Sequence, residues 1–217
     1  MSLLKIIMQG GWLMIPILLF SIIAVVLIVN KYLDLKHFKS DNAHLLYELK
    51  ALLAGGKKQA ALNLCADSDG AIPLVLGEGL LHSHLDKEGM ESYMEAAGTE
   101  QVHLMEKNMS LLATIAGVAP LTGFLGTVTG MISAFMEIER LGGNVNANVL
   151  AGGIWEALMT TAAGLAVGII AYLFYNYFTA KIKHMAYEIE SSSNELVDII
   201  IENRQNKIPN RELQYEN

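Results

Sequence analysis

The chain is poor in cysteine and in positive charge. Cys65 is its single cysteine, which excludes an intramolecular disulfide and a metal site built from several cysteines. We expect this thiol to be a small buried hydrophobic group in a reducing compartment. Lysine and arginine number 15 against 22 aspartate and glutamate residues, so the formal net charge is −7. Nucleic acid is therefore not an expected partner, because binding its phosphates needs a basic surface.

Motifs for nucleotides and metals are also missing. The run Gly55-Gly56-Lys57-Lys58 lacks the spacing of a phosphate-binding loop and its following Ser or Thr, so ATP hydrolysis is not expected. His82-Ser83-His84 resembles a metal pair, but no cysteine or clustered acid completes a ligand set, and a solvated helix or loop is the simpler interpretation. We therefore expect no enzyme, no cofactor and no metal.

Hydrophobic residues are abundant instead. They make up 53% of the chain, and the mean hydropathy is +0.37, too apolar for an ordinary soluble domain. Apolar segments at residues 12–29, 111–135 and 150–178 are each long enough to cross a bilayer. The first is longer than the usual core of a signal peptide, and no small-residue cleavage site follows it. The predicted fold is an all-α membrane protein with three transmembrane helices.

Basic residues near the ends of these segments predict the orientation. Most lie on one side: Lys31, Lys36, Lys39, Lys107, Lys181 and Lys183, against Lys5 and Arg140 on the other. Because cytoplasmic loops carry the excess of basic residues, the N-terminus is expected in the periplasm and the C-terminus in the cytoplasm. The expected location is thus the inner membrane of a bacterium, with lipid around the three helices.

This orientation divides the chain into six parts. Residues 1–30 hold the periplasmic start and the first transmembrane helix, and residues 31–110 a cytoplasmic helical region. Residues 111–136 form the second transmembrane helix, 137–149 a periplasmic turn and 150–178 the third transmembrane helix. Residues 179–217 form a cytoplasmic extension and tail.

Several helix boundaries can be predicted in the cytoplasmic parts. A leucine-rich helix should end at Gly55-Gly56, with further helices at residues 57–66 and 73–84 and a break at Lys87-Glu88-Gly89. No strong breaker separates Met90 from the second apolar segment, so we expect one helix of about 70 Å over residues 90–135. The third should continue to about Arg204, before a frayed tail at residues 206–217.

The second and third apolar segments carry small and hydroxyl residues on two faces. In the second segment, one face holds Gly123, Thr127, Gly130 and Ala134. The other face holds Thr122, Gly126, Thr129 and Ser133. In the third segment, one face holds Ala157, Thr161, Gly164 and Gly168, and the other holds Glu156, Thr160 and Ala163. Helices that permit close approach on two faces suit a ring, in which each helix touches a neighbour on either side.

Three polar residues in these segments are the candidate functional groups. Thr127 and Thr161 are each expected about 6 Å outward from the bilayer midplane, so their hydroxyls can lie at one level and solvate a carboxyl group in either protonation state. Each threonine could instead bond only a carbonyl of its own helix. Glu156 is costly inside a bilayer, at about 2.5 kcal/mol or more, unless it is an interfacial acid paired with Arg140.

These residues carry a family resemblance. Gly117-Val118-Ala119-Pro120-Leu121 and the following run from Gly123 to Met131 resemble the second-span signature of the ExbB/TolQ/MotA proton-channel family, closest to its ExbB/TolQ branch. The third apolar segment is similar to the last span of that family. The residues that carry this similarity are Glu156-Ala157-Leu158, Thr161, Gly164-Leu165 and Tyr175-Asn176-Tyr177-Phe178. One departure is Ile169-Ile170-Ala171, where the family often has a proline.

The resemblance implies a homopentamer whose second and third spans line a central pore. In the pore would lie the single helices of an ExbD/TolR-like partner dimer, each with a transmembrane aspartate. Proton flow would drive rotation, and a TonB- or TolA-like protein would carry the force to an envelope target. Thr127, Thr161 and Glu156 would form the ion pathway. The expected packing residues of the pore helices are Pro120, Gly123, Gly126, Gly130, Ala157, Gly164 and Gly168.

Two other functions remain open. A passive membrane scaffold would use the small-residue faces for oligomerisation alone and would not conduct ions. A secondary transporter would normally have more spans and an inverted repeat, and this chain has neither. For the motor, the driven process could be TonB-type import, Tol-type envelope maintenance, gliding or secretion.

Overall fold

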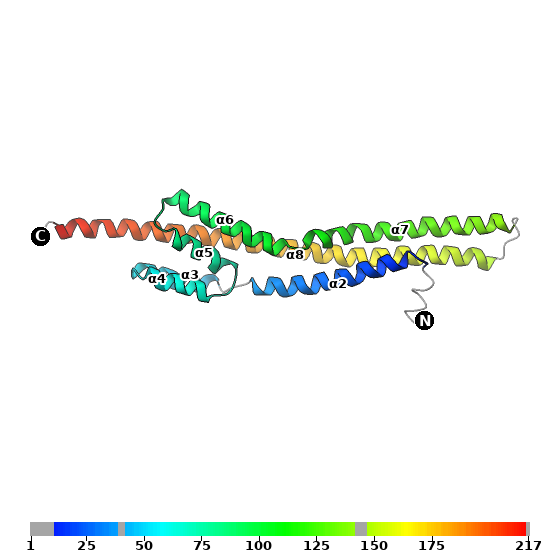
Figure 1. The fold of residues 1–217 in the computed structure, drawn as a ribbon, viewed down its shortest axis with the longest axis horizontal. Helices are drawn as coiled ribbons and strands as arrows, with labels where there is room; N and C mark the ends of the chain where they lie inside the picture. Colours follow the sequence, from blue (N-terminus) through cyan, green and yellow to red (C-terminus); the bar gives the residue numbers. More distant parts are fainter. Residues whose placement is uncertain (1–10, 39–41, 142–146, 216–217) are drawn as a thin grey trace. The chain divides into compact units, whose positions relative to one another are not determined.

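The computed structural model describes residues 11–38, 42–141 and 147–215, and these ranges are helical without a strand. The helices shown in Figure 1 are α2 (Met14–His37), α3 (Asn42–Ala54), α4 (Lys58–Asp67), α5 (Ala71–Leu81), α6 (Lys87–Glu106), α7 (Met109–Arg140) and α8 (Ala147–Tyr215). The chain divides into two compact units. Unit 1 comprises Met1–Lys31 and Asn108–Thr179, and unit 2 comprises Tyr32–Lys107 and Ala180–Asn217.

Three helical stretches are long and apolar enough to cross a membrane: Met14–Lys36, Lys87–Arg140 and Ala151–Gln205. They overlap almost entirely with the three apolar segments identified in the sequence, so the prediction of an all-α fold with three candidate spans is confirmed for the described residues. Pro16 lies in the first turn of α2, where its missing N–H has no helical acceptor to lose. Lys5, Lys39 and part of the expected turn at residues 137–149 lie outside the described residues; the helix α7 itself continues to Arg140.

Unit 1 is built from α2, α7 and the first part of α8. The buried face of α7 changes along its length from large to small residues: Met109, Leu112, Ile115, Ala119, Gly123, Gly126, Gly130 and Ala134. A large part of the remaining α7 surface is apolar and exposed, as expected for a helix in contact with lipid or with other protein chains.

Unit 2 is a helical bundle of α3 to α6 with the last part of α8. Consecutive helices from α3 to α6 contact each other, and α8 joins them where a Cβ at Gly98 of α6 would lie 3.2 Å from Ile189 Cγ2. Its core holds apolar side chains with almost no exposed surface: Leu49, Val75, Leu76, Leu80, Met90, Met94, Leu196 and Val197.

The turn between α3 and α4 forms as predicted at Gly55-Gly56. Gly56 has a φ of 69°, and its N–H donates to Leu53 O at 3.0 Å, while Lys57 N–H donates to Leu52 O at 2.9 Å. These two bonds form a Schellman motif, which needs a left-handed residue at this position and therefore favours glycine.

The predicted break at Lys87-Glu88-Gly89 is wrong. These residues form the first turn of α6, and Asp86 is its N-cap, accepting a hydrogen bond from Gly89 N–H at 3.0 Å. An aspartate at this position satisfies one of the N–H groups that a helix start leaves without a partner. The glycine therefore lies inside the helix, and the break comes earlier, before Asp86.

Two predictions about long helices also need correction. The single helix expected over residues 90–135 is interrupted, because Lys107 is extended with a ψ of 131° and Asn108 is left-handed with a φ of 65°. Asparagine adopts this conformation more readily than most residues. The helix expected to end near Arg204 continues instead to Tyr215, past Pro209.

Candidate functional site

The contact between α7 and α8 is made by residues with little or no side chain. A Cβ added at Gly123 would lie 2.8 Å from Thr160 O and 3.1 Å from Thr161 Cα. At Gly164, it would lie 2.5 Å from Ala119 O. The backbones of the two helices thus approach as closely as small residues allow.

The same contact continues along both helices. Gly130 lies against Ala157, Gly126 against the side chain of Thr160, and Gly168 against the ring of Pro120. All seven predicted packing residues, from Pro120 to Gly168, therefore lie at this contact within one chain. This row of small residues on both helices is called the glycine ladder below.

Two threonine hydroxyls meet inside the glycine ladder. Thr127 Oγ1 and Thr161 Oγ1 are hydrogen-bonded to each other across the two helices, and both side chains are half-buried. They lie at one level because two contacts fix the register of the helices. Gly123 of α7 lies against Thr161 of α8, and Gly130 of α7 lies against Ala157 of α8. The structure therefore brings together the two threonines that the sequence paired.

Backbone carbonyls on both helices surround this pair. Thr161 Oγ1 lies 2.9 Å from Gly123 O and 3.2 Å from Ala157 O, and Thr127 Oγ1 lies 3.2 Å from Ala157 O. The two hydroxyls have two hydrogens to donate, and the available acceptors are two carbonyl oxygens and the two hydroxyl oxygens themselves. Two hydrogens cannot occupy all of these acceptors. A hydroxyl oxygen of the pair can therefore accept a hydrogen bond from a further donor.

Other hydroxyls in α7 do not reach across the contact. Thr122 donates to Val118 O at 2.9 Å and Thr129 donates to Leu125 O at 3.0 Å, so each bonds a carbonyl of its own helix. This is the local bonding that threonine commonly adopts inside membrane helices. Thr122 and Thr129 therefore provide matched controls for the pair.

Glu156 lies apart from the threonine pair. Its half-buried carboxyl group packs against the backbone of Gly11, where an added Cβ would overlap with Glu156 Oε1. Gly11 has a φ of 65° and directly precedes α2. Arg140, the alternative partner considered for Glu156, instead donates to Glu137 at 2.6 and 2.8 Å.

Four residues at these contacts were not singled out as site residues in the sequence. Thr160 is buried, with its hydroxyl 2.9 Å from Ala157 O, and its side chain fills the space above Gly126. Gly153 faces Ala134, and Ala119 O faces Gly164. The contact of Gly153 with Ala134 could have been found in the sequence, because Gly153 and Ala157 are small residues four positions apart and so lie on one helix face.

The sequence comparisons cover the part of the chain that holds these residues. Residues 68–191, which include Thr127, Glu156 and Thr161, match the MotA/TolQ/ExbB proton channel family. The chain belongs to this family. As a member, it is a multi-pass membrane protein of the transport and channel type and not an enzyme.

Similar proteins carry ExbB names. The chain is 30% identical over 173 residues to "Putative biopolymer transport protein ExbB-like 3" of Synechocystis sp., covering 79% of this chain and 82% of that protein. It is 43% identical over 94 residues to "Putative biopolymer transport protein ExbB-like 1" of the same organism, covering 42% of this chain and 37% of that protein. It is 40% identical over 95 residues to "Biopolymer transport protein exbB1" of Vibrio cholerae, covering 42% of this chain and 40% of that protein. The chain thus spans less than half the length of the last two relatives.

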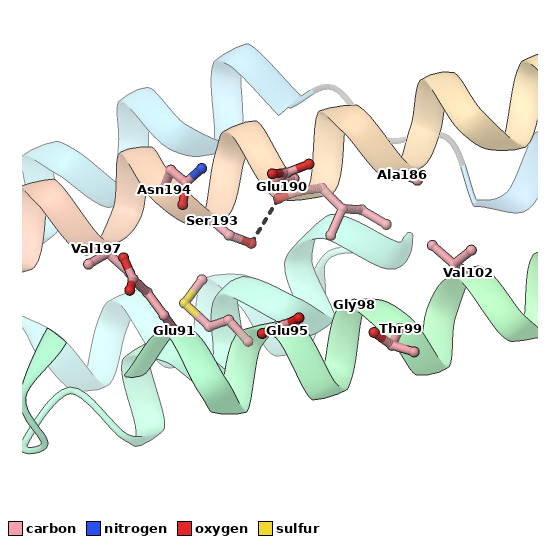
Figure 2. Close-up of a pocket in the computed structure, with 12 residues that line it drawn as sticks. Glu91, Glu95, Gly98, Thr99, Val102, Ala186, Glu190, Ser193, Asn194 and Val197 are labelled. Carbon is pink, nitrogen blue, oxygen red and sulfur yellow. Dashed lines mark hydrogen bonds between the residues drawn. The ribbon is translucent and has the colours of Figure 1, made fainter. Parts of the chain in front are cut away.

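Unit 2 of this family member contains a groove between α6 and α8 (Figure 2). Its volume is about 550 Å³, and Glu91, Glu95 and Glu190 line it together with apolar residues such as Val102 and Val197. Figure 2 shows Ser193 in the groove, with its hydroxyl bonded to the backbone of its own helix. None of the predicted site residues lines this groove.

The described part of the chain offers no metal centre. No group of three or more His, Cys, Asp or Glu residues there is placed to hold a metal ion. His82 stacks on Tyr93 with the ring centroids 3.7 Å apart, and its Nδ1 lies 3.1 Å from Glu78 O. Cys65 of α4 is buried against Gly77 of α5, and burial raises the pKa of its thiol to about 11. The thiol is therefore protonated at neutral pH.

Proposed function

We propose that this chain is the ring-forming subunit of a proton-driven motor in the bacterial inner membrane. In this proposal, five copies surround a pore lined by α7 and α8. The pore holds the single helices of a dimeric ExbD/TolR-like partner, each bearing a transmembrane aspartate. The observation that carries the proposal is the hydroxyl pair of Thr127 and Thr161, which joins the two helices in this family member.

The chemistry of the pair suits an acid that gains and loses a proton. A protonated carboxylic acid donates one hydrogen bond, and Thr127 Oγ1 can accept it while its own hydrogen points to Ala157 O, 3.2 Å away. When the acid is deprotonated, the Thr127 hydroxyl rotates and donates to the carboxylate. Both states of the acid are therefore solvated without movement of either helix.

The energy for motion comes from the ion gradient. One charge that crosses a membrane potential of 100 mV releases about 2.3 kcal/mol, which can bias a rotational step if protons do not leak past. Exposed apolar side chains of α7 at this depth, such as Leu121, Phe124 and Leu125, provide surfaces that exclude water. A proton then crosses only on the partner's aspartate.

Glu156 has a different role in this proposal. It lies five residues from Thr161, about 7.5 Å along α8, and it faces the start of α2 rather than the hydroxyl pair. If the N-terminus is periplasmic, Glu156 lies toward the periplasmic end of the pathway. There its carboxylate takes up a proton from the periplasmic side, and the resulting carboxyl group passes that proton to the partner's aspartate.

The names of the relatives favour import over other driven processes. Several similar proteins are called biopolymer transport proteins, including those of Xanthomonas campestris and Vibrio cholerae. We therefore favour a motor that energises import through a TonB-like protein, with Tol-type envelope maintenance as the second candidate.

Threonine variants test the proposal directly. The chain and its partner are reconstituted in liposomes, and proton flux is measured under an imposed potential. Thr127→Val and Thr161→Val are expected to reduce flux at least tenfold, because valine keeps the shape but removes the hydroxyl. Thr122→Val and Thr129→Val are expected to retain flux, since those hydroxyls bond only their own helix. Mass measurement of the purified ring should give five copies.

A passive scaffold predicts the opposite pattern. Its oligomer would form normally, and Thr161→Val and Glu156→Gln would leave function in cells intact. Equal flux in the Thr161→Val and Thr122→Val variants would therefore reject the motor proposal. So would a purified ring that shows no gradient-dependent activity with any single-span partner.

A further inference from the structure

Gly11 lies in the turn before α2 and contacts the side chain of Glu156 within unit 1. A Cβ added at Gly11 would lie 3.4 Å from Glu156 Cγ and 2.8 Å from Glu156 Cδ, and it would overlap with Glu156 Oε1. Ordinary van der Waals contact begins at 3.4 Å. The carboxyl group of Glu156 therefore occupies the place that a side chain at residue 11 would take.

The start of α2 holds the backbone of Gly11 in place. Met14 N–H donates a hydrogen bond to Gly11 O at 3.2 Å, and the side chain of Met14 is buried. The next N–H group, that of Ile15, donates to Trp12 O at 3.2 Å. Gly11 itself has a φ of 65°, a conformation that glycine adopts without strain. The turn therefore needs glycine for its backbone conformation and, separately, for the space that Glu156 fills.

We propose that Gly11 is a positioning residue for Glu156. This inference rests on the proposed function, in which the carboxylate of Glu156 takes up a proton from the periplasmic side. Because residue 11 has no side chain, the carboxyl group lies against the start of α2 and away from the hydroxyl pair of Thr127 and Thr161. The first transmembrane helix thus takes part in the ion pathway through a residue that carries no polar side chain of its own.

A methyl group at residue 11 would displace this carboxyl group. Glu156 Cδ would have to move from 2.8 to 3.4 Å from the added Cβ, a shift of about 0.6 Å, and Oε1 would have to move further. A displacement of about 1 Å in a reacting group can reduce a rate by about 100-fold. Gly11→Ala is therefore expected to reduce proton flux by about tenfold. The same substitution strains the left-handed backbone, so a second variant must separate the two effects.

Shortening the acid by one methylene group separates them. In Glu156→Asp, the carboxyl carbon takes about the position of Glu156 Cγ, which lies 3.4 Å from the added Cβ. Aspartate therefore fits beside alanine at residue 11, whereas glutamate does not. In reconstituted liposomes with the partner, Gly11→Ala should reduce flux about tenfold when residue 156 is glutamate and less than about twofold when it is aspartate. Backbone strain is the same in both backgrounds, so a purely structural role of Gly11 predicts equal losses.

The position of the carboxyl group can also be measured without the partner. The full-length chain in liposomes reacts with a hydrophobic carbodiimide, which modifies protonated carboxyl groups in apolar surroundings, and mass spectrometry quantifies the peptide that contains Glu156. Gly11→Ala should label Glu156 several-fold faster than wild type, because the carboxyl group leaves its half-buried place beside α2. The matched control is Gly56→Ala, which strains another left-handed glycine, with a φ of 69°, in unit 2. It should change neither flux nor labelling.

The outcomes distinguish this inference from the proposed function. If Glu156→Gln and Thr161→Val keep the flux of wild type, the motor proposal fails. If those two variants lose flux but Gly11→Ala keeps it, or loses as much beside aspartate as beside glutamate, the positioning role alone is overturned. If Glu156→Asp carries no flux of its own, the labelling comparison decides. Equal labelling of Glu156 in Gly11→Ala, Gly56→Ala and wild type would also overturn the positioning role.

Discussion

Gly164 offers the sharpest test of the α7–α8 contact. In Gly164→Ala, the new methyl group would lie 2.5 Å from Ala119 O and 2.9 Å from Gly123 Cα, whereas ordinary contact begins at 3.4 Å. The obstructing atoms belong to the backbone of α7, so no side chain can rotate away. The two helices must therefore separate by about 0.9 Å.

The expected magnitude follows from two opposing effects. Overpacking of a close contact costs about 1–3 kcal/mol, and alanine in a helix gains about 0.5–1 kcal/mol over glycine. Gly164→Ala should thus lower the free energy of unfolding by up to about 2.5 kcal/mol. Gly117→Ala should raise it by up to about 1 kcal/mol, because no atom lies within 4 Å of the added Cβ.

The assay compares the unfolding of the detergent-solubilised variants by denaturant titration. Opposite signs for the two glycine variants are the expected result, and Gly152→Ala is a second control with no atom within 4 Å. If Gly164→Ala is as stable as Gly117→Ala, the helices are not in the close contact described here. The assignment of the glycine ladder as a packing surface would then be wrong.

Three further predictions concern unit 2 and its boundary. Asp86→Ala should lower the free energy of unfolding by about 1 kcal/mol, whereas Asp86→Asn should stay close to wild type. Equal unfolding midpoints for these two variants would contradict the role of Asp86 as the N-cap of α6. Asn108→Val should lower the free energy of unfolding by about 1–2 kcal/mol. Asn108→Gly should not lower it, because the φ of Asn108 is 65°, which glycine adopts without strain. Circular dichroism on heating compares the stability of the two variants. Cys65 should react slowly with thiol reagents at pH 8 unless the protein is unfolded. Its pKa rises from 9.0 to about 11 on folding, so the free energy of unfolding should decrease between those pH values.

Much of the fold could be predicted because its signals are local. The three apolar segments depend only on composition and length, and Gly55-Gly56 forms the turn that a glycine pair predicts. The break at Asn108 was missed because a single asparagine is a weaker breaker than glycine or proline, although it adopts the left-handed conformation more readily than most residues. Gly89 was misinterpreted because its effect as a breaker is outweighed by the cap that Asp86 provides.

The site was predictable to a similar degree. Spacing along each helix placed Thr127 and Thr161 on the glycine faces, and the antiparallel arrangement made a common level possible. The register between the two helices depends on contacts such as Gly126 with Thr160, which periodicity within one helix cannot determine. The position of Glu156 against Gly11 depends on a third helix, so it was also beyond helical periodicity.

The glycine ladder has a mechanical consequence for the proposed ring. Because Gly123 and Gly164 bring the backbones of α7 and α8 into direct contact, the glycine ladder leaves little room there for a change in the spacing of the two helices. Each hairpin should therefore move as a rigid body, and any change in pore diameter must occur by sliding at the boundaries between neighbouring subunits. A covalent cross-link within one hairpin should then leave the pore diameter free to change, whereas cross-links between neighbouring subunits should fix it.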